Sequence, residues 1–215
     1  MKKILLFITA FVISLSTSYA GGAYERTMGE SIGQIFSSKS EDMDALANKF
    51  NRIGEAEKDK WLPYYYASMT YIFKSFQLQE STAKDQALQS AQQSLDKAKD
   101  LVEANSEISS LQGFLYMISL SVDPANRGQS MSPKAFAAFE KALALNPKNP
   151  RAILFKGQMM YGAAEFFGSG TEEACGMVLK SIEIFEAQEG NQTMQPSWGI
   201  VSARQYQEKC NSVSK

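Results

Sequence analysis

Side chains able to perform acid–base, nucleophilic or metal chemistry are scarce in this sequence, and histidine is absent altogether. Histidine is the commonest general base and metal ligand, so its absence excludes every Ser–His and Cys–His catalytic pair. Carboxylates are plentiful, but a pair such as Glu172 and Glu173 follows Thr171, at the start of an expected helix, where acidic side chains offset the helix dipole. The stretch "GSGTEE" lacks the lysine and the spacing of a phosphate-binding loop. The sequence therefore predicts a non-enzymatic protein with no catalytic residues, no metal site and no cofactor.

The two cysteines, Cys175 and Cys210, lie at similar distances before and after the loop "QEGNQTMQ". If the helices on either side of this loop are antiparallel, the two residues come level, within reach of the ~5.5 Å Cα separation that a disulfide requires. Two buried free thiols are the alternative. Because the chain has no Cys-x-x-Cys motif, we predict a structural disulfide rather than a redox pair.

The first twenty residues have the layout of a secretory signal peptide. Lys2 and Lys3 precede an uncharged apolar run, Ile4–Leu15, and small residues lead up to Ala20. The run is too short to span a bilayer comfortably, and no cysteine follows it to carry a lipid. We expect cleavage after Ala20 and a periplasmic or secreted protein, with residues 21–215 forming a single domain.

Charge composition limits the classes of partner. The chain has 22 Lys and Arg residues against 23 Asp and Glu residues, and no basic stripe stands out. We therefore expect no nucleic-acid binding and, once the signal peptide is removed, no membrane insertion. Neither the oligomeric state nor the identity of a partner follows from the composition.

The elements that position these residues are all expected to be helices, because helical periodicity recurs along the chain and strand signals are scarce. Asn149 before Pro150 and Ser132 before Pro133 have the form of helix starts, with a capping side chain followed by a proline in the first turn. The expected helices cover residues 24–37, 41–56, 60–77, 82–103, 107–122, 133–145, 150–164, 172–187 and 196–211.

A spacing of small and large residues repeats between these helices. Ala135, Phe139 and Ala142 have the 4, 3 spacing found earlier at Ala91, Leu95 and Ala98. Small residues also recur in the preceding helices, at Ala67, Gly113 and Gly157. Small residues let two helices approach closely, and the large residue between them fills the groove, as stacked helix pairs require.

These positions resemble the tetratricopeptide repeat family. Gly113 and Tyr116 match its first-helix pattern, and Ala135, Phe139, Ala142 and Pro147 match its second-helix pattern. The resemblance implies an all-α solenoid of antiparallel helix pairs: an N-terminal pair at 24–56, three repeat-like pairs over 60–187 and a C-terminal capping helix at 196–211. These repeats span 39 to 46 residues, longer than the family's ~34, with the insert "SVDPANRGQSMS" lying between paired helices.

A second resemblance concerns "NPRAILFKGQMMYGAAEFFGSGTEEA", which is similar to a segment of the helical T-component of tripartite solute importers. It implies an alternative function, that of a small-solute-binding accessory of an envelope transporter. Such a protein would use an enclosed pocket rather than an open groove.

A stripe of aromatic and polar residues is the predicted binding surface. Trp61, Tyr64 and Tyr71 share one helix face, and the first helices of such pairs line the concave side of a solenoid. Tyr and Arg are enriched at binding hot spots, although individual aromatics often belong to the core. We therefore predict a binding scaffold for a peptide or protein segment of the cell envelope. The candidate residues are Trp61, Tyr64, Tyr71, Phe114, Arg151, Gln158, Tyr161 and Tyr206.

Overall fold

The computed structural model describes residues 22–188 and 194–213, and the expected signal peptide lies outside them. Within these ranges the protein is all-helical and has no strand. A helix over residues 22–34 precedes eight further helices: α2 (Ser40–Ala56), α3 (Leu62–Gln77), α4 (Ser81–Asp100), α5 (Ser106–Val122), α6 (Pro124–Leu145), α7 (Pro150–Phe167), α8 (Glu172–Ala187) and α9 (Ile200–Val213). None of the described helices is both long and apolar enough to cross a membrane.

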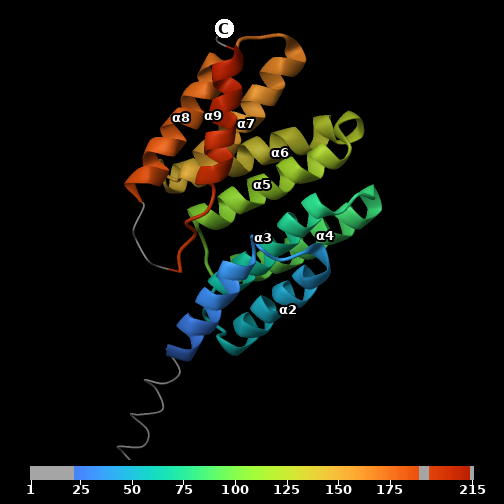
Figure 1. Ribbon diagram of the computed structural model, residues 1–215, viewed down its shortest axis with the longest axis vertical. Helices are drawn as coiled ribbons and strands as arrows, with labels where there is room; N and C mark the ends of the chain where they lie inside the picture. The colour runs from blue at the N-terminus through green and yellow to red at the C-terminus, as the bar shows by residue number, and fades with distance from the viewer. Residues whose placement is uncertain (1–21, 189–193, 214–215) are drawn as a thin grey trace, which may run out of the picture.

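The N-terminal helix and α2 lie at one end of the long axis, α3 to α6 follow, and α7, α8 and α9 lie together at the other end (Figure 1). Each helix from α2 to α9 packs against the next, and α3, α5 and α7 also contact one another in that order. The short turns that join packed helices make the pairs α3/α4, α5/α6 and α7/α8 antiparallel. The contacts among α3, α5 and α7 form one layer, on which the site described below lies.

The repeated small residues are packing residues. Phe139 is fully buried, and its ring lies directly on the backbone of Gly113, where a Cβ atom would overlap it. Gly54 of α2 is covered in the same way by the ring of Tyr64. Glycine at these points lets α5 meet α6 and α2 meet α3 at close range.

Two helix starts differ from the sequence prediction by a full turn or more, and the other starts by at most two residues. The expected start at Pro133 is wrong, because α6 begins at Pro124 and contains Pro133. The side chain of Asp123 accepts a hydrogen bond from the Asn126 N–H, so an Asp cap followed by Pro124 starts the helix inside the supposed insert. The expected start of α9 at Pro196 is also wrong: α9 begins at Ile200, after Gly199 with φ of 120°.

The predicted disulfide between Cys175 and Cys210 is confirmed. It joins α8 to α9 with a Cα–Cα distance of 5.7 Å. Tyr161 and Tyr206 pack beside it in a small cluster separate from the main core. The bond therefore ties the last helix to the rest of the protein at a point distant from the start of α9.

Candidate functional site

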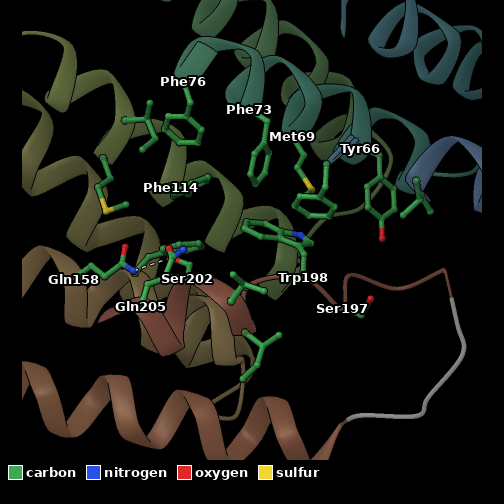
Figure 2. Close-up of a pocket in the computed structure, with 18 residues that line it drawn as sticks. Tyr66, Met69, Phe73, Phe76, Phe114, Gln158, Ser197, Trp198, Ser202 and Gln205 are labelled. Atoms are coloured by element: carbon green, nitrogen blue, oxygen red, sulfur yellow. Dashed lines mark hydrogen bonds between the residues drawn. The ribbon is translucent and has the colours of Figure 1, made fainter. Parts of the chain in front are cut away.

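A cavity of about 700 Å³ lies on the α3–α5–α7 layer, bounded on its other side by residues 197–202 and 205 (Figure 2). Its volume is within the range of small-molecule and cofactor sites. The described lining residues include no charged side chain. Most are apolar, and the aromatic ones are Phe36, Tyr66, Phe73, Phe76, Phe114, Phe155 and Trp198.

One wall of the cavity is a single face of α3. Tyr66, Met69, Phe73 and Phe76 are spaced 3, 4 and 3 residues apart, which places them on one side of a helix (Figure 2). Phe73 makes edge-on ring contacts with Phe36 and Phe76, at centroid distances of 5.2 and 5.7 Å. This wall reaches the surface at Phe36 and Phe76, which are 63% and 50% exposed. The cavity is therefore open to a ligand along an apolar rim.

The adjoining wall is a cluster of three aromatic rings, and it meets the α3 wall where Phe73 contacts Trp198 edge-on at 5.9 Å. Phe114 of α5 stacks on Phe155 of α7 with a centroid distance of 4.2 Å and an interplanar angle of 18°. Trp198 lies 5.7 Å from each of these rings. Rings held on several sides have little freedom, so the cavity presents a preformed aromatic surface.

Trp198 belongs to a strap, defined as residues 194–199, that crosses from the C-terminal part of the protein to α3. The Trp198 indole N–H donates to the Tyr65 hydroxyl at 3.0 Å. The Tyr66 hydroxyl donates to the Met194 carbonyl at 2.9 Å, and the Arg151 guanidinium donates to the Trp198 carbonyl at 2.9 Å. Three hydrogen bonds from α3 and α7 thus hold the strap in place, and the strap holds the indole against the cavity.

A buried ion pair supports the strap. The Arg151 Nε donates to Glu107 at 2.6 Å, and a second guanidinium nitrogen donates to the other carboxylate oxygen at 2.7 Å. Burial alone would lower the pKa of Arg151, but the hydrogen bonds and charge of Glu107 outweigh it and raise that pKa above its ordinary value. Arg151 therefore stays charged and serves as a fixed donor to the Trp198 carbonyl.

The cavity offers little acid–base or metal chemistry. Burial raises the pKa of Tyr66, and also that of Tyr65, so both phenols stay neutral under physiological conditions. Among the described residues, no group of three or more Cys, Asp or Glu side chains is arranged to hold a metal ion. The described lining of the cavity is therefore mostly apolar and neutral.

Two of the eight residues predicted from the sequence, Phe114 and Gln158, line the cavity. Tyr64 and Tyr71 lie on the other face of α3, against α2: Tyr64 covers Gly54, and the Tyr71 hydroxyl donates to Asn48 at 3.3 Å. Tyr64 also borders a separate depression of about 380 Å³ lined with charged residues.

The other four predicted residues lie outside the cavity. Trp61 makes an edge-on contact with Tyr65, and Arg151 lies beneath the strap. Tyr161 and Tyr206 contact each other edge-on beside the disulfide. The structure therefore does not bring the predicted set together on one surface.

Sequence reasoning missed most of the lining residues, and Phe73, Phe76 and Trp198 are the aromatic ones that shape the cavity most. Phe73 and Phe76 follow the periodicity of α3 as well as Tyr64 and Tyr71 do, so the pattern alone does not choose between the two faces. For Trp198 a signal existed: "QPSWGI" places a tryptophan between a proline and a glycine, which favours a non-helical segment over a helix.

Comparison with known proteins finds similarity to a solved structure. No protein-family model matches the chain, and no curated protein matches it significantly. Among solved structures, the HusA haemophore from Porphyromonas gingivalis is similar, with 28% sequence identity and a TM-score of 0.78. The match covers 91% of this chain and 96% of HusA, so it includes nearly all of the described helices.

Proposed function

We propose that this protein binds a haem-type tetrapyrrole in the cavity between α3 and the strap. The cavity itself is the observation that carries the proposal: about 700 Å³ of space, lined largely by aromatic rings and with no charged lining residue in the described chain. The similarity to the HusA haemophore over 91% of the chain supports the same ligand class. A haemophore is a binding protein rather than an enzyme, which is also the class that we expect from the absence of histidine.

The walls suit a flat, apolar macrocycle. In Figure 2, Phe73, Phe76 and Met69 lie along one side of the cavity, and Phe114 and Trp198 lie across from them. Rings stacked on a planar π-system contribute about 0.5–1.5 kcal/mol each beyond the burial of their area. Phe73 contacts Trp198 edge-on at 5.9 Å and Phe76 lies 6.2 Å from Phe114, so the two walls meet in one continuous aromatic surface. A macrocycle lying against this surface would replace water over one of its faces.

Coordination of a haem iron by this chain has weak support. The chain has no histidine, and the Tyr66 hydroxyl is already hydrogen-bonded to Met194. Its raised pKa also opposes the phenolate form that ligates iron. The thioethers of Met69 and Met117 are the remaining lining groups that could ligate iron. The lining residues therefore fit the macrocycle better than its metal.

A peptide segment is the second candidate ligand, within a tetratricopeptide-like solenoid as the sequence predicts. The contacts of α5 with both α3 and α7 favour it, because first helices line the groove in such arrays. A peptide, however, brings a backbone donor and acceptor with nearly every residue, and these need partners when buried. The mostly apolar lining would leave many of them unsatisfied, so we rank the tetrapyrrole first.

An exported location fits both candidates. The disulfide between Cys175 and Cys210 is of a kind that persists outside the cytosol, and the similarity to a haemophore agrees with a periplasmic or secreted protein. The transporter-accessory alternative also requires a small-solute pocket in the envelope. That alternative differs from our proposal in the solute that is bound, and both use a pocket for a small molecule.

Titration of the purified protein with haemin tests the proposal, followed by Soret absorbance and by quenching of tryptophan fluorescence. A matched pair of double variants separates the cavity from other exposed rings. Phe36→Ala/Phe76→Ala removes the rim, and Phe166→Ala/Phe167→Ala removes two rings that are 82% and 78% exposed at the end of α7. We expect the rim variant to weaken haemin binding about tenfold or more and the control to bind as wild type does. Metal-free protoporphyrin should bind to the wild type with similar affinity.

Failure of the wild type to bind either porphyrin would contradict the proposal. Equal weakening by both double variants would also contradict it, because binding would then depend on exposed rings in general. Binding of unstructured peptides by a wild type that ignores porphyrins would move the assignment to the second candidate.

A further inference from the structure

One end of the cavity carries a cluster of neutral polar side chains. Gln158 of α7 donates from Nε2 to the Ser202 hydroxyl of α9 at 3.1 Å, and Gln205 lies one turn further along α9 (Figure 2). Gln158 is buried, with 8% of its surface exposed, whereas Gln205 is exposed. All three residues line the cavity.

This cluster has hydrogen-bonding capacity that the described part of the chain does not use. Within it, the Gln158 amide makes only its bond to Ser202, and the Gln205 amide and the Ser202 hydroxyl proton have no partner. An amide can donate twice and accept twice. None of these side-chain atoms is sealed from solvent without a partner, so the unused donors are available to an acceptor on a ligand at this end of the cavity.

The local field favours an acceptor with negative charge. Ser202 lies in the first turn of α9, which begins at Ile200, so the positive end of a 14-residue helix faces this end of the cavity. No described lining residue is Asp or Glu, so no carboxylate in the cavity wall repels an anion.

The opposite end of the cavity is less suited to this role. There the Tyr66 hydroxyl already donates to the Met194 carbonyl, and the only other polar lining residue is the exposed Ser197 among those described. Figure 2 places Tyr66 and Ser197 at the end away from Gln158. The middle of the cavity is thus aromatic. At one end the Tyr66 hydroxyl already has a partner, and at the other end the Gln158 cluster has hydrogen-bond donors that no described residue uses.

We propose that Gln158, Ser202 and Gln205 form a subsite for a carboxylate substituent of the bound macrocycle. The inference rests on the proposed function and adds the ligand's orientation: the carboxylate edge lies at α9 and the apolar edge lies toward Met69 and Phe73. The subsite makes the protein selective for a porphyrin carboxylic acid over the same ring without free carboxylates.

Affinities for protoporphyrin IX and for its dimethyl ester, measured for wild type and for Gln158→Met, test the subsite. Methionine keeps the length of glutamine and removes its hydrogen bonds. We expect the wild type to prefer the diacid about tenfold, since a hydrogen bond to a charged group contributes more than a neutral one. Gln158→Met should lose most of that preference while binding the diester as the wild type does.

Gln158→Glu places a negative charge beside the ligand carboxylate and should weaken diacid binding more than diester binding. Gln205→Leu tests the same subsite from an exposed position that the fold does not depend on, and Gln207→Leu on the same helix is its matched control, because Gln207 does not line the cavity. We expect Gln205→Leu to lower the diacid preference and Gln207→Leu to leave it unchanged. If Gln158→Met proves unstable, this second pair decides the outcome.

The two proposals fail differently. A diacid-to-diester ratio that is the same in wild type, Gln158→Met and Gln205→Leu would overturn the subsite and leave tetrapyrrole binding intact. Absence of binding of both porphyrins to the wild type would remove the proposed function and the subsite together.

Discussion

The two faces of α3 have similar side chains and different surroundings. On the face toward α2, Tyr64 lies on Gly54 and Tyr71 reaches Asn48. On the other face, Phe73 and Phe76 border a cavity of about 700 Å³ and extend to an exposed rim. Both faces are aromatic, but only one of them is closed by a packed helix.

The difference lies in the neighbour rather than in α3. Gly54 has no side chain, so α2 can approach until its backbone meets the Tyr64 ring. Across the other face, the strap contacts α3 through Trp198 and Met194 and leaves the cavity beside it. An aromatic stripe on a helix therefore indicates an apolar neighbour, and the shape of that neighbour decides whether the stripe becomes core or binding surface.

The largest expected effect comes from Arg151→Met, which removes one partner of the buried pair with Glu107. Breaking such a pair costs about 3–5 kcal/mol, because a buried charge is left uncompensated. The substitution also releases the Trp198 carbonyl, so the open face of α3 should change and the α2 face should not. Chemical denaturation gives the stability, and emission in a Trp61→Phe background reports Trp198, since the chain has two tryptophans.

Arg204→Met is the matched control for this prediction. Arg204 pairs with Glu186 at 3.3 Å, and the two side chains are 60% and 50% exposed. Exposed pairs contribute about 0–1 kcal/mol, so the control should unfold near the wild-type midpoint. Similar losses in the two variants would show that Arg151 does not hold the strap.

An intermediate effect is expected from Cys175→Ser/Cys210→Ser. Loss of the disulfide should lower the free energy of unfolding by about 2–4 kcal/mol. The bond ties α9 to α8, and α9 carries Val201 and Ser202 of the cavity wall. Hydrogen exchange of the variant should therefore speed up in α9 and stay unchanged in α2 and α3. Equal acceleration in all three helices would contradict a local role for the disulfide.

The smallest effects compare the two faces of α3 directly. Tyr71→Phe removes only the hydroxyl bonded to Asn48 and should cost about 1 kcal/mol of stability with no change in porphyrin affinity. Phe73→Leu keeps an apolar side chain but removes ring contacts, and should weaken porphyrin binding by about 0.5–1.5 kcal/mol. Thermal unfolding and fluorescence titration of both variants check the pair. A binding loss in Tyr71→Phe that matches that in Phe73→Leu would end the distinction between the faces.

Much of the fold was predictable because its signals are local. Asn149 before Pro150 marks the start of α7, and its side chain accepts from two backbone N–H groups of the first turn. The disulfide followed from the positions of Cys175 and Cys210 about one loop. The start of α6 was misplaced because Pro133 and Asp123–Pro124 both have the form of a helix start, and local chemistry did not choose between them.

The candidate site was less predictable. Phe114 and Gln158 were found because each directly follows one of the recurring small residues, Gly113 and Gly157. Phe73 and Trp198 were not found. Whether Phe73 lines a cavity depends on which face of α3 is covered by a packed helix. The position of Trp198 depends on a strap whose hydrogen bonds join residues far apart in the chain, such as Trp198 to Tyr65.

The sequence by itself determined the helical class, the close-packing glycines, the disulfide and the exclusion of histidine-based chemistry. Each of these features follows from residue type and short-range spacing, which determine structure within one helix or between two neighbouring helices. Only the tertiary structure decided which aromatic face stays open and where the unused polar groups meet. Those outcomes depend on the distance between α3 and α9, which packing across the whole chain sets.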